Sequence, residues 1–442
     1  MRMQSGVLGL ILLSLSFLPF LAAAPAAAQS FESVAGWSST VASSCGDEAG
    51  SECSLAGVTR TALGGGIAHY TLDLKVGAGE REVVGLHRVV AETLPFLPKP
   101  TEDAVFLVHG DVWTFDAAFT DVARFLAQAG VDVWGIDLRW TRVPATTIDF
   151  AFMADWGLST DAHDVGVGLA VARGLRGATG SGFGKLHLLG WSRGGLIGYT
   201  YLNAETQKPE TLRHAAGFIP VDIYGKTDDE TLLQAACTRV GQGEARLAAG
   251  EYQDGSGALL AAIGNLAVAA PDADSPILPG LPNRTVALLA GAATFLFFPP
   301  GLEPVPFYHF TGGQFDANGL PTALSFTPES QWISFLRAGA PYEPVKVLLD
   351  SDRLICNQED VPFDDHWQQV TVPVLYVGAG GGFGSYGVYT TSLLGSTDVT
   401  SHLVSLAPPE FRIADFGHGD LFLATDAPAL VWQPILEWIR AH

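Results

Sequence analysis

Short, largely apolar runs alternate with helical patterns along much of the chain. Such runs are typical of strands that are buried on both faces of a sheet. Phe119, Val122, Ala123 and Leu126 recur at the spacing of one helix face. The runs predict strands at residues 104–108, 131–136, 185–189, 215–220, 372–377 and 411–415, with further helices at 161–175, 194–203 and 427–439. This alternation predicts an α/β fold in which a mostly parallel sheet is flanked by helices.

The segment before the first buried strand has another pattern. Residues 30–65 are rich in Ser, Gly and Ala and are expected to be mostly loop. Residues 68–76 and 82–92 are β-rich. They predict two strands that join the sheet ahead of its parallel part.

Residues 223–369 break the alternation of strands and helices. They include an Ala/Leu-rich stretch at 258–270 and predict a largely helical cap, inserted between core parts at 29–222 and 370–442. Eight of its apolar side chains are too hydrophobic for an exposed surface. These are Val286, Ala287, Leu288, Leu289, Phe295, Leu296, Phe297 and Phe298. They either line an apolar acyl or alcohol pocket or only pack the cap against the sheet.

The N-terminus resembles an export signal. A basic start, an apolar run over residues 6–21 and the small residues Ala26, Ala27 and Ala28 predict a signal peptide at residues 1–28. The alternative is a membrane anchor, but the run is short for a bilayer span. We therefore expect a secreted or periplasmic protein with no integral membrane segment in the mature chain.

Charge and cysteine content agree with export. The formal net charge of -22 disfavours nucleic acid as a partner. Four cysteines in an exported chain favour disulfides, and sequence alone allows three pairings. We favour the pairs Cys45–Cys53 and Cys237–Cys356.

The strongest chemical signal is Gly190-Trp191-Ser192-Arg193-Gly194, between a predicted strand and a predicted helix. A serine at such a turn is exposed as a nucleophile at the carboxyl edge of the sheet, and flanking glycines are needed because side chains would clash. The alternative is an ordinary glycine-rich turn in which Ser192 only caps the helix. His418, before the last helix, lies where the chain order serine–acid–histidine requires the general base.

A third motif, His109-Gly110-Asp111, follows the first buried strand. A loop there supplies one backbone N–H of an oxyanion hole, and the residue after the nucleophile supplies the other. Asp111 and Arg193 are therefore the predicted donors. Because the Asp111 carboxylate is unfavourable beside a developing negative charge, we expect it to point away or to meet a cation.

The stretches LVHGDVW, GWSRGG and GHGDLFLATDAPALVWQPILEWI together resemble α/β-hydrolases. The last of them is similar to the acid lipase and sterol esterase group. The resemblance covers most of residues 104–222 and 370–442 and implies a triad. In that family the acid usually follows the strand that matches residues 372–377, but here the loop at 378–384 contains no acid. Asp222 and Asp398 are the alternatives, and we favour Asp222 because it follows a strand at the active edge. Asp398 precedes a β-like run at 399–406, which would place it at the opposite edge, unless 411–415 is the last strand and Asp398 returns to the site.

Together these signals predict a serine hydrolase that cleaves a carboxylic ester through an acyl-enzyme. The substrate is expected to be a small molecule or a lipid-like ester, with no cofactor and no metal. Amide or peptide hydrolysis on the same scaffold is the first alternative. A binding protein that kept the fold without catalysis is the second, and an intact Ser–His pair weighs against it.

Overall fold

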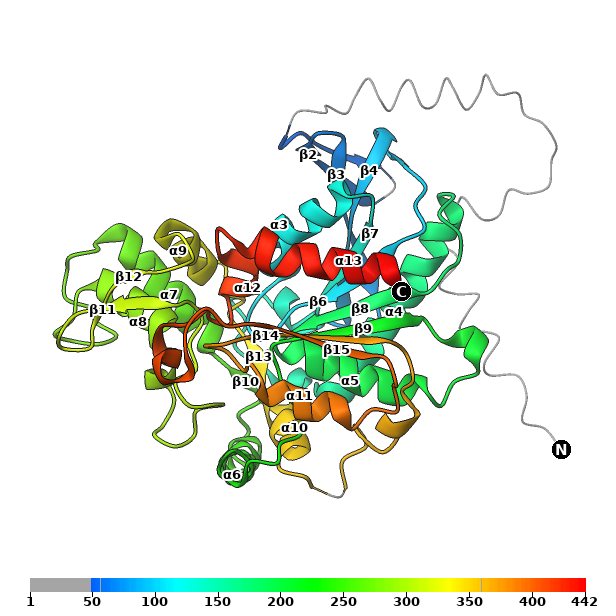
Figure 1. Ribbon diagram of the computed structural model, residues 1–442. Helices are drawn as coiled ribbons and strands as arrows, with labels where there is room; N and C mark the ends of the chain where they lie inside the picture. The colour runs from blue at the N-terminus through cyan, green and yellow to red at the C-terminus, as the bar shows by residue number, and fades with distance from the viewer. Residues whose placement is uncertain (1–48, 56, 359) are drawn as a thin grey trace, which may run out of the picture.

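The computed structural model describes residues 49–55, 57–358 and 360–442 (Figure 1). The predicted signal peptide at residues 1–28 and Cys45 lie outside this part of the chain. The pairing of Cys45 with Cys53 therefore stays a prediction.

One large sheet forms the centre of the described chain. It has 11 strands in the order β1-β2-β3-β4-β7-β6-β8-β9-β14-β15, with β5 paired to β4. The parallel part comprises β7 (Asp132–Asp137), β6 (Ala104–Val108), β8 (Leu186–Trp191), β9 (Ala215–Val221), β14 (Val374–Ala379) and β15 (Val399–Val404). The antiparallel part comprises β1 (Glu52–Leu55), β2 (Val58–Gly64), β3 (Ile67–Lys75), β4 (Val83–Leu94) and β5 (Leu97–Pro98). The predicted α/β fold with a mostly parallel core sheet is confirmed.

Helices cover both faces of the sheet because its central strands are apolar on both sides. Val105 and Leu107 of β6 pack with α3 and α13, whereas Phe106 and Val108 pack with α4 and α5. Figure 1 shows α3 and α13 above the sheet and α5 below it. The core helices are α3 (Phe115–Gln128), α4 (Leu158–Ala178), α5 (Arg193–Glu205), α11 (Tyr386–Ser392), α12 (Asp420–Leu423) and α13 (Gln433–Ala441). Shorter helical turns are η2 (Arg139–Arg142), η3 (Ala151–Met153), η4 (Glu210–Leu212), η5 (Thr294–Phe297), η6 (Trp367–Gln369), η7 (Pro409–Ala414) and η8 (Pro428–Trp432).

Two expectations about strands were wrong. Residues 411–415 do not form the last strand, because Pro408 and Pro409 lack the N–H groups of a ladder and begin a 3₁₀ turn instead. The last strand is β15, an edge strand whose mostly exposed residues give no buried run. The segment at 30–65 was expected to be mostly loop, but its described part, from residue 49 on, is mostly strand and contributes β1 and β2. There Arg60 interrupts the apolar pattern, but it is buried against Glu92 of β4, with Nη2 2.6 Å from Oε2.

Helices are the main regular structure of residues 223–369, where a largely helical cap was expected, but they make up just under half of it, and the segment also holds two small sheets. The helices are α6 (Glu230–Ala248), α7 (Ser256–Ala269), α8 (Asn283–Ala292), α9 (Glu329–Arg337) and α10 (Val345–Ile355). The small sheets pair β10 (Gln253–Asp254) with β13 (Glu343–Pro344) and β11 (Gly313–Phe315) with β12 (Pro321–Leu324). Figure 1 shows α7, α8, α9, β11 and β12 grouped at one end of the molecule. The division of the chain into core and cap stays our interpretation.

The apolar run of the cap divides into a buried and an exposed half. Val286 and Ala287 of α8 are buried in a core cluster with Trp332 and Phe335, and Leu288 and Leu289 are buried as well. In η5, however, Leu296 and Phe297 are 61% and 36% exposed. The expectation that all eight side chains avoid the surface was wrong for these two, because a 3₁₀ turn cannot place every residue against the core. Packing in the core explains the apolar side chains of α8. A pocket-lining role for residues of this run stays a hypothesis.

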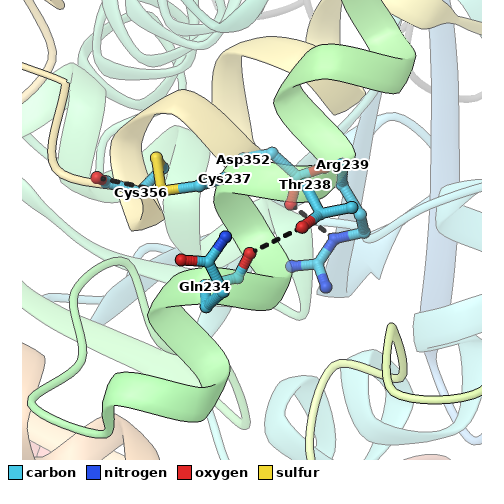
Figure 2. Close-up of a disulfide and its surroundings, with 6 residues drawn as sticks. All are labelled: Gln234, Cys237, Thr238, Arg239, Asp352 and Cys356. Carbon is cyan, nitrogen blue, oxygen red and sulfur yellow. Dashed lines mark hydrogen bonds and ion pairs between the residues drawn. A yellow bond between two sulfur atoms is a disulfide. The ribbon is translucent and has the colours of Figure 1, made fainter.

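A disulfide joins the two ends of this inserted segment. Cys237 of α6 and Cys356 at the end of α10 are bonded, with their Cα atoms 4.9 Å apart and a sequence separation of 119 (Figure 2). Beside the disulfide, Arg239 Nε donates to Asp352 Oδ1 at 2.8 Å. The predicted Cys237–Cys356 pairing is confirmed. Among the residues described, no helix is both long and apolar enough to cross a bilayer.

Candidate active site

Ser192 lies on a sharp turn between β8 and α5. Its backbone has φ 56° and ψ -131°, a conformation that non-glycine residues rarely adopt. A Cβ at Gly190 would lie 2.2 Å from the carbonyl oxygen of Gly194, and one at Gly110 would lie 2.7 Å from Ser192 Cβ. The turn therefore requires glycine at both positions. It presents Ser192 beside the His109-Gly110-Asp111 loop.

The structure brings His418 and Asp222 together. His418 Nδ1 lies 2.7 Å from Asp222 Oδ2, and the two residues are 1% and 0% exposed. Since a carboxylate only accepts, Nδ1 carries the proton and Nε2 keeps its lone pair. Within the described chain Nε2 has no hydrogen-bond partner. A buried lone pair of this kind is available to take a proton from a nucleophile or from water.

The glycine-rich loop at 378–384, which lacks an acid of its own, binds the acid of the neighbouring strand. Asp222 Oδ1 accepts from the backbone N–H groups of Ala379 at 2.8 Å and Gly384 at 2.9 Å. Its Oδ2 accepts from Phe383 N–H at 3.0 Å. Asp222 itself has a positive φ of 50°. Three backbone donors thus fix the carboxylate that contacts His418.

Gly382 of this loop is expected to be intolerant of any side chain. A Cβ there would lie 1.9 Å from Asp222 Oδ2 and 3.1 Å from His418 Cα. We predict that Gly382→Ala displaces the carboxylate and lowers ester turnover on the order of a hundredfold, the usual cost of a misplacement of about 1 Å. Steady-state kinetics on a chromogenic ester measure the effect.

The matched control is Gly174→Ala in α4, where a Cβ would meet nothing within 4 Å. That variant should keep full turnover. A Gly382→Ala enzyme that is as active as its parent would contradict the role of the loop in holding Asp222.

Aromatic rings surround His418. Ring centroids of Trp191, Phe310, Tyr308 and Phe383 lie 5.0, 5.2, 5.4 and 5.5 Å from that of His418. Burial, followed by repulsion from nearby Asp222, raises the pKa of Tyr308 well above its ordinary value, so it stays a neutral phenol. These rings cover the buried His418–Asp222 pair.

Sequence reasoning missed three of these four residues. Tyr308 and Phe310 belong to an irregular part of the cap segment that carries no motif. They reach the site because the chain there pairs with the His418 loop, where His418 N–H donates to His309 O at 3.0 Å. Phe383 lies in the glycine-rich loop, and its contact with Asp222 through the backbone N–H is visible only in the structure.

The two predicted oxyanion donors are linked through their side chains. Arg193 Nη2 donates to Asp111 Oδ2 at 2.7 Å, and Arg193 Nε contacts Asp111 Oδ1. The expected cation is therefore Arg193. Burial alone would raise the pKa of Asp111, but the Arg193 guanidinium overcomes this and lowers it. Arg193 Nε also lies 3.6 Å from Glu343 Oε1. Burial and repulsion from Asp111 raise the pKa of Glu343 well above its ordinary value.

The backbone N–H groups of Asp111 and Arg193 donate to no other group in the part of the chain that is described. Such free amides beside a nucleophile are able to stabilise an oxyanion. The ion pair between the Asp111 and Arg193 side chains holds the two backbone segments that carry these amides in position relative to each other.

Other polar residues of the predicted motifs have structural positions. His109 accepts from Leu138 N–H through Nε2 at 3.1 Å, and its Nδ1 lies 2.9 Å from Gly110 O. Asp420 accepts from Gly312 and Gly417 N–H groups, each at 2.8 Å, and burial raises its pKa to about 7. It thereby anchors the His418 loop. Asp398, the alternative acid, precedes β15 at the opposite edge and lies 3.3 Å from His442 Nε2.

In comparisons with known proteins, this chain is similar to solved structures but matches no family model and no curated sequence. A solved structure from Sulfolobus solfataricus, assigned as a lipase, is 17% identical over 85% of this chain and 95% of that one, with a TM-score of 0.58. A thermophilic esterase from Thermogutta terrifontis is 15% identical over 84% and 98%, with a TM-score of 0.40. An α/β-hydrolase-fold protein from Nakamurella multipartita is 14% identical over 84% and 99%, with a TM-score of 0.38. The first likeness, together with the strand order, shows that this chain has the α/β-hydrolase fold.

Proposed function

We propose that this protein is a secreted serine hydrolase that cleaves carboxylic esters through an acyl-enzyme. The observation that carries the proposal is the buried His418–Asp222 pair, 2.7 Å apart, at a sheet edge where Ser192 stands on a strained turn. Strain at a non-glycine residue is retained where function requires it. The finer likeness of the C-terminal stretch to acid lipases and sterol esterases belongs to this proposal as well.

In the acylation half-reaction, Ser192 Oγ attacks the ester carbonyl carbon while His418 Nε2 accepts the hydroxyl proton. Asp222 stabilises the imidazolium that forms. The carbonyl oxygen becomes an oxyanion that the backbone N–H groups of Asp111 and Arg193 bind. When the tetrahedral intermediate collapses, the C–O bond to the alcohol breaks. His418 then donates its proton to the leaving alkoxide.

In the deacylation half-reaction, His418 Nε2 accepts a proton from water, whose oxygen attacks the acyl carbon. The second tetrahedral intermediate uses the same two amides. Its collapse releases the carboxylic acid, and Ser192 Oγ takes back the proton from His418. No step requires a group outside this chain, the ester and water.

The aromatic rings around His418 favour an apolar ester over a charged one. The side chains of Tyr308, Phe310 and Phe383 make the surroundings of His418 apolar. A polar acyl or alcohol group placed there would lose its hydration. Within this setting the apolar cap run remains the candidate for an acyl or alcohol pocket. An amide or peptide substrate is the alternative, since the same residues cleave both bonds.

A fluorophosphonate probe, together with a panel of esters and matched amides, tests the proposal. We expect one label per chain on Ser192 and hydrolysis of the esters, with rates that depend on acyl-chain length. If the amides were cleaved faster than their matched esters, the proposed substrate class would change from esters to amides. A folded protein that takes no label and hydrolyses neither would identify a binding protein and overturn the proposal.

A further inference from the structure

Two histidines lie together on the face of the sheet that α3 covers, away from the residues assigned to ester hydrolysis. In the antiparallel pair of β3 and β4, His69 lies opposite Val89 and His87 lies opposite Thr71. The two histidines are therefore diagonal neighbours on one face. Their side chains meet, with His69 Nε2 2.9 Å from His87 Nδ1, and the residues are 8% and 4% exposed.

A carboxylate on the next strand lies beside His87 and favours a proton on its Nε2. Asp137 ends β7, lies opposite Gly85 and places Oδ2 3.2 Å from His87 Nε2. Asp137 Oδ1 is occupied by the N–H of Phe115 at 2.7 Å. Because the carboxylate accepts, His87 Nε2 carries a proton and His87 Nδ1 is an acceptor. His69 then has two neutral tautomers: a proton on Nε2 is donated to His87 Nδ1, whereas a proton on Nδ1 leaves the lone pairs of the two rings facing each other.

A second carboxylate lies beside the other nitrogen of His69. His69 Nδ1 lies 3.7 Å from Oδ1 of Asp116, whose side chain in the first turn of α3 is 62% exposed. In the first tautomer the Nδ1 lone pair of His69 faces this carboxylate, and in the second the lone pairs of the two rings face each other, so each neutral form brings two acceptors together without a donor. A second proton on His69 would relieve the contact, but it would bury a charged imidazolium. A metal ion bound by the facing lone pairs of His69 Nε2 and His87 Nδ1 relieves it without that cost.

We propose that His69, His87 and Asp116 bind one divalent transition-metal ion, with Zn²⁺ the best match to the donors. One donor atom from each of the three residues lies within 4.8 Å of the others. Two imidazoles and a carboxylate suit Zn²⁺, with ligand distances near ~2.0–2.2 Å, and water completes the coordination. Asp137 is the carboxylate that typically orients a metal-bound histidine through its other nitrogen. The ion enters past Asp116 and joins β3, β4 and α3.

The test uses the mature chain, without a histidine tag, after dialysis against a chelator. Zn²⁺ is titrated in competition with a chromophoric chelator, and Co²⁺ is titrated by absorption spectroscopy. We expect one ion per chain and an increase in thermal unfolding temperature when Zn²⁺ is present. Loss of an orienting partner alone typically weakens metal affinity about 10- to 100-fold, so Asp137→Asn should fall in that range and His69→Gln should lose at least as much.

Asp116→Asn is the decisive variant because its side chain is exposed and the substitution leaves the core intact. It should weaken Zn²⁺ binding at least about tenfold. The matched controls are Asp121→Asn on the exposed face of the same helix and His163→Gln on the surface of α4. Both should bind as the parent does. A parent chain that binds no Zn²⁺ at one equivalent, or an Asp116→Asn variant that binds as tightly as the parent, would overturn the site. Neither result bears on Ser192.

Discussion

Replacement of Ser192 by alanine is expected to lower ester turnover about a million-fold, the loss typical when the nucleophile of a serine hydrolase is removed. His418 and the two oxyanion amides remain, but no oxygen is left to form the acyl-enzyme. The fold should be unaffected, because the glycines at 190 and 194 and the strain at φ 56° are already part of the parent turn. Single-turnover hydrolysis by purified variant protein measures the loss.

Ser159→Ala, on the exposed surface of α4, serves as the control and should retain both turnover and labelling by a fluorophosphonate. The circular dichroism spectrum of Ser192→Ala should match that of the parent. If pure Ser192→Ala protein kept more than roughly one per cent of the parent rate, the assignment of the nucleophile would be refuted.

The features that sequence predicted well are local ones. The β8–Ser192–α5 turn follows from five consecutive residues, because its glycines are demanded by contacts inside the motif itself and with the adjoining loop. The central strands are buried on both faces and are therefore visible as apolar runs. The edge strand β15 has mostly exposed residues, so its pattern gave no such signal and residues 411–415 were preferred in its place.

The features that sequence could not fix depend on contacts between distant segments. His418 and Asp222 are 196 residues apart. Tyr308 and Phe310 reach His418 through backbone pairing with its loop. Likewise, the His69–His87 cluster arises from strand register and from the helix that crosses it. No sequence motif predicts these contacts, because each of them depends on the order in which the strands lie side by side in the sheet.

The position of Asp222 explains how the proposed triad could form although the glycine-rich loop, where the resemblance places the acid, has none. Strands β9 and β14 are parallel neighbours, with Val221 opposite Val377, and Asp222 N–H donates to Val377 O at 2.7 Å. The end of β9 therefore lies beside the loop that follows β14. An acid at the end of β9 reaches the same point as one in that loop, provided that the loop has no side chain at Gly382 to obstruct it.

Asp222→Asn is expected to lower ester turnover about ten-thousandfold, as the same change does in a serine protease. Every carboxylate oxygen of Asp222 accepts two N–H groups: Oδ1 those of Ala379 and Gly384, and Oδ2 those of Phe383 and His418. An amide has only one acceptor atom, so its NH₂ group must face two donors in either orientation. The variant thus disfavours the Nδ1–H form of His418 or displaces the loop.

Asp398→Asn provides the comparison, because Asp398 is the other acid that sequence allowed and lies at the opposite edge near His442. It should leave turnover unchanged. Each unmatched buried donor costs about 1–3 kcal/mol, so Asp222→Asn should also unfold at a lower temperature. Kinetics are therefore measured well below the unfolding transition of both variants. If Asp222→Asn were then fully active, or if Asp398→Asn were the variant that lost turnover, His418 would be oriented by another group and the triad proposed here would be wrong.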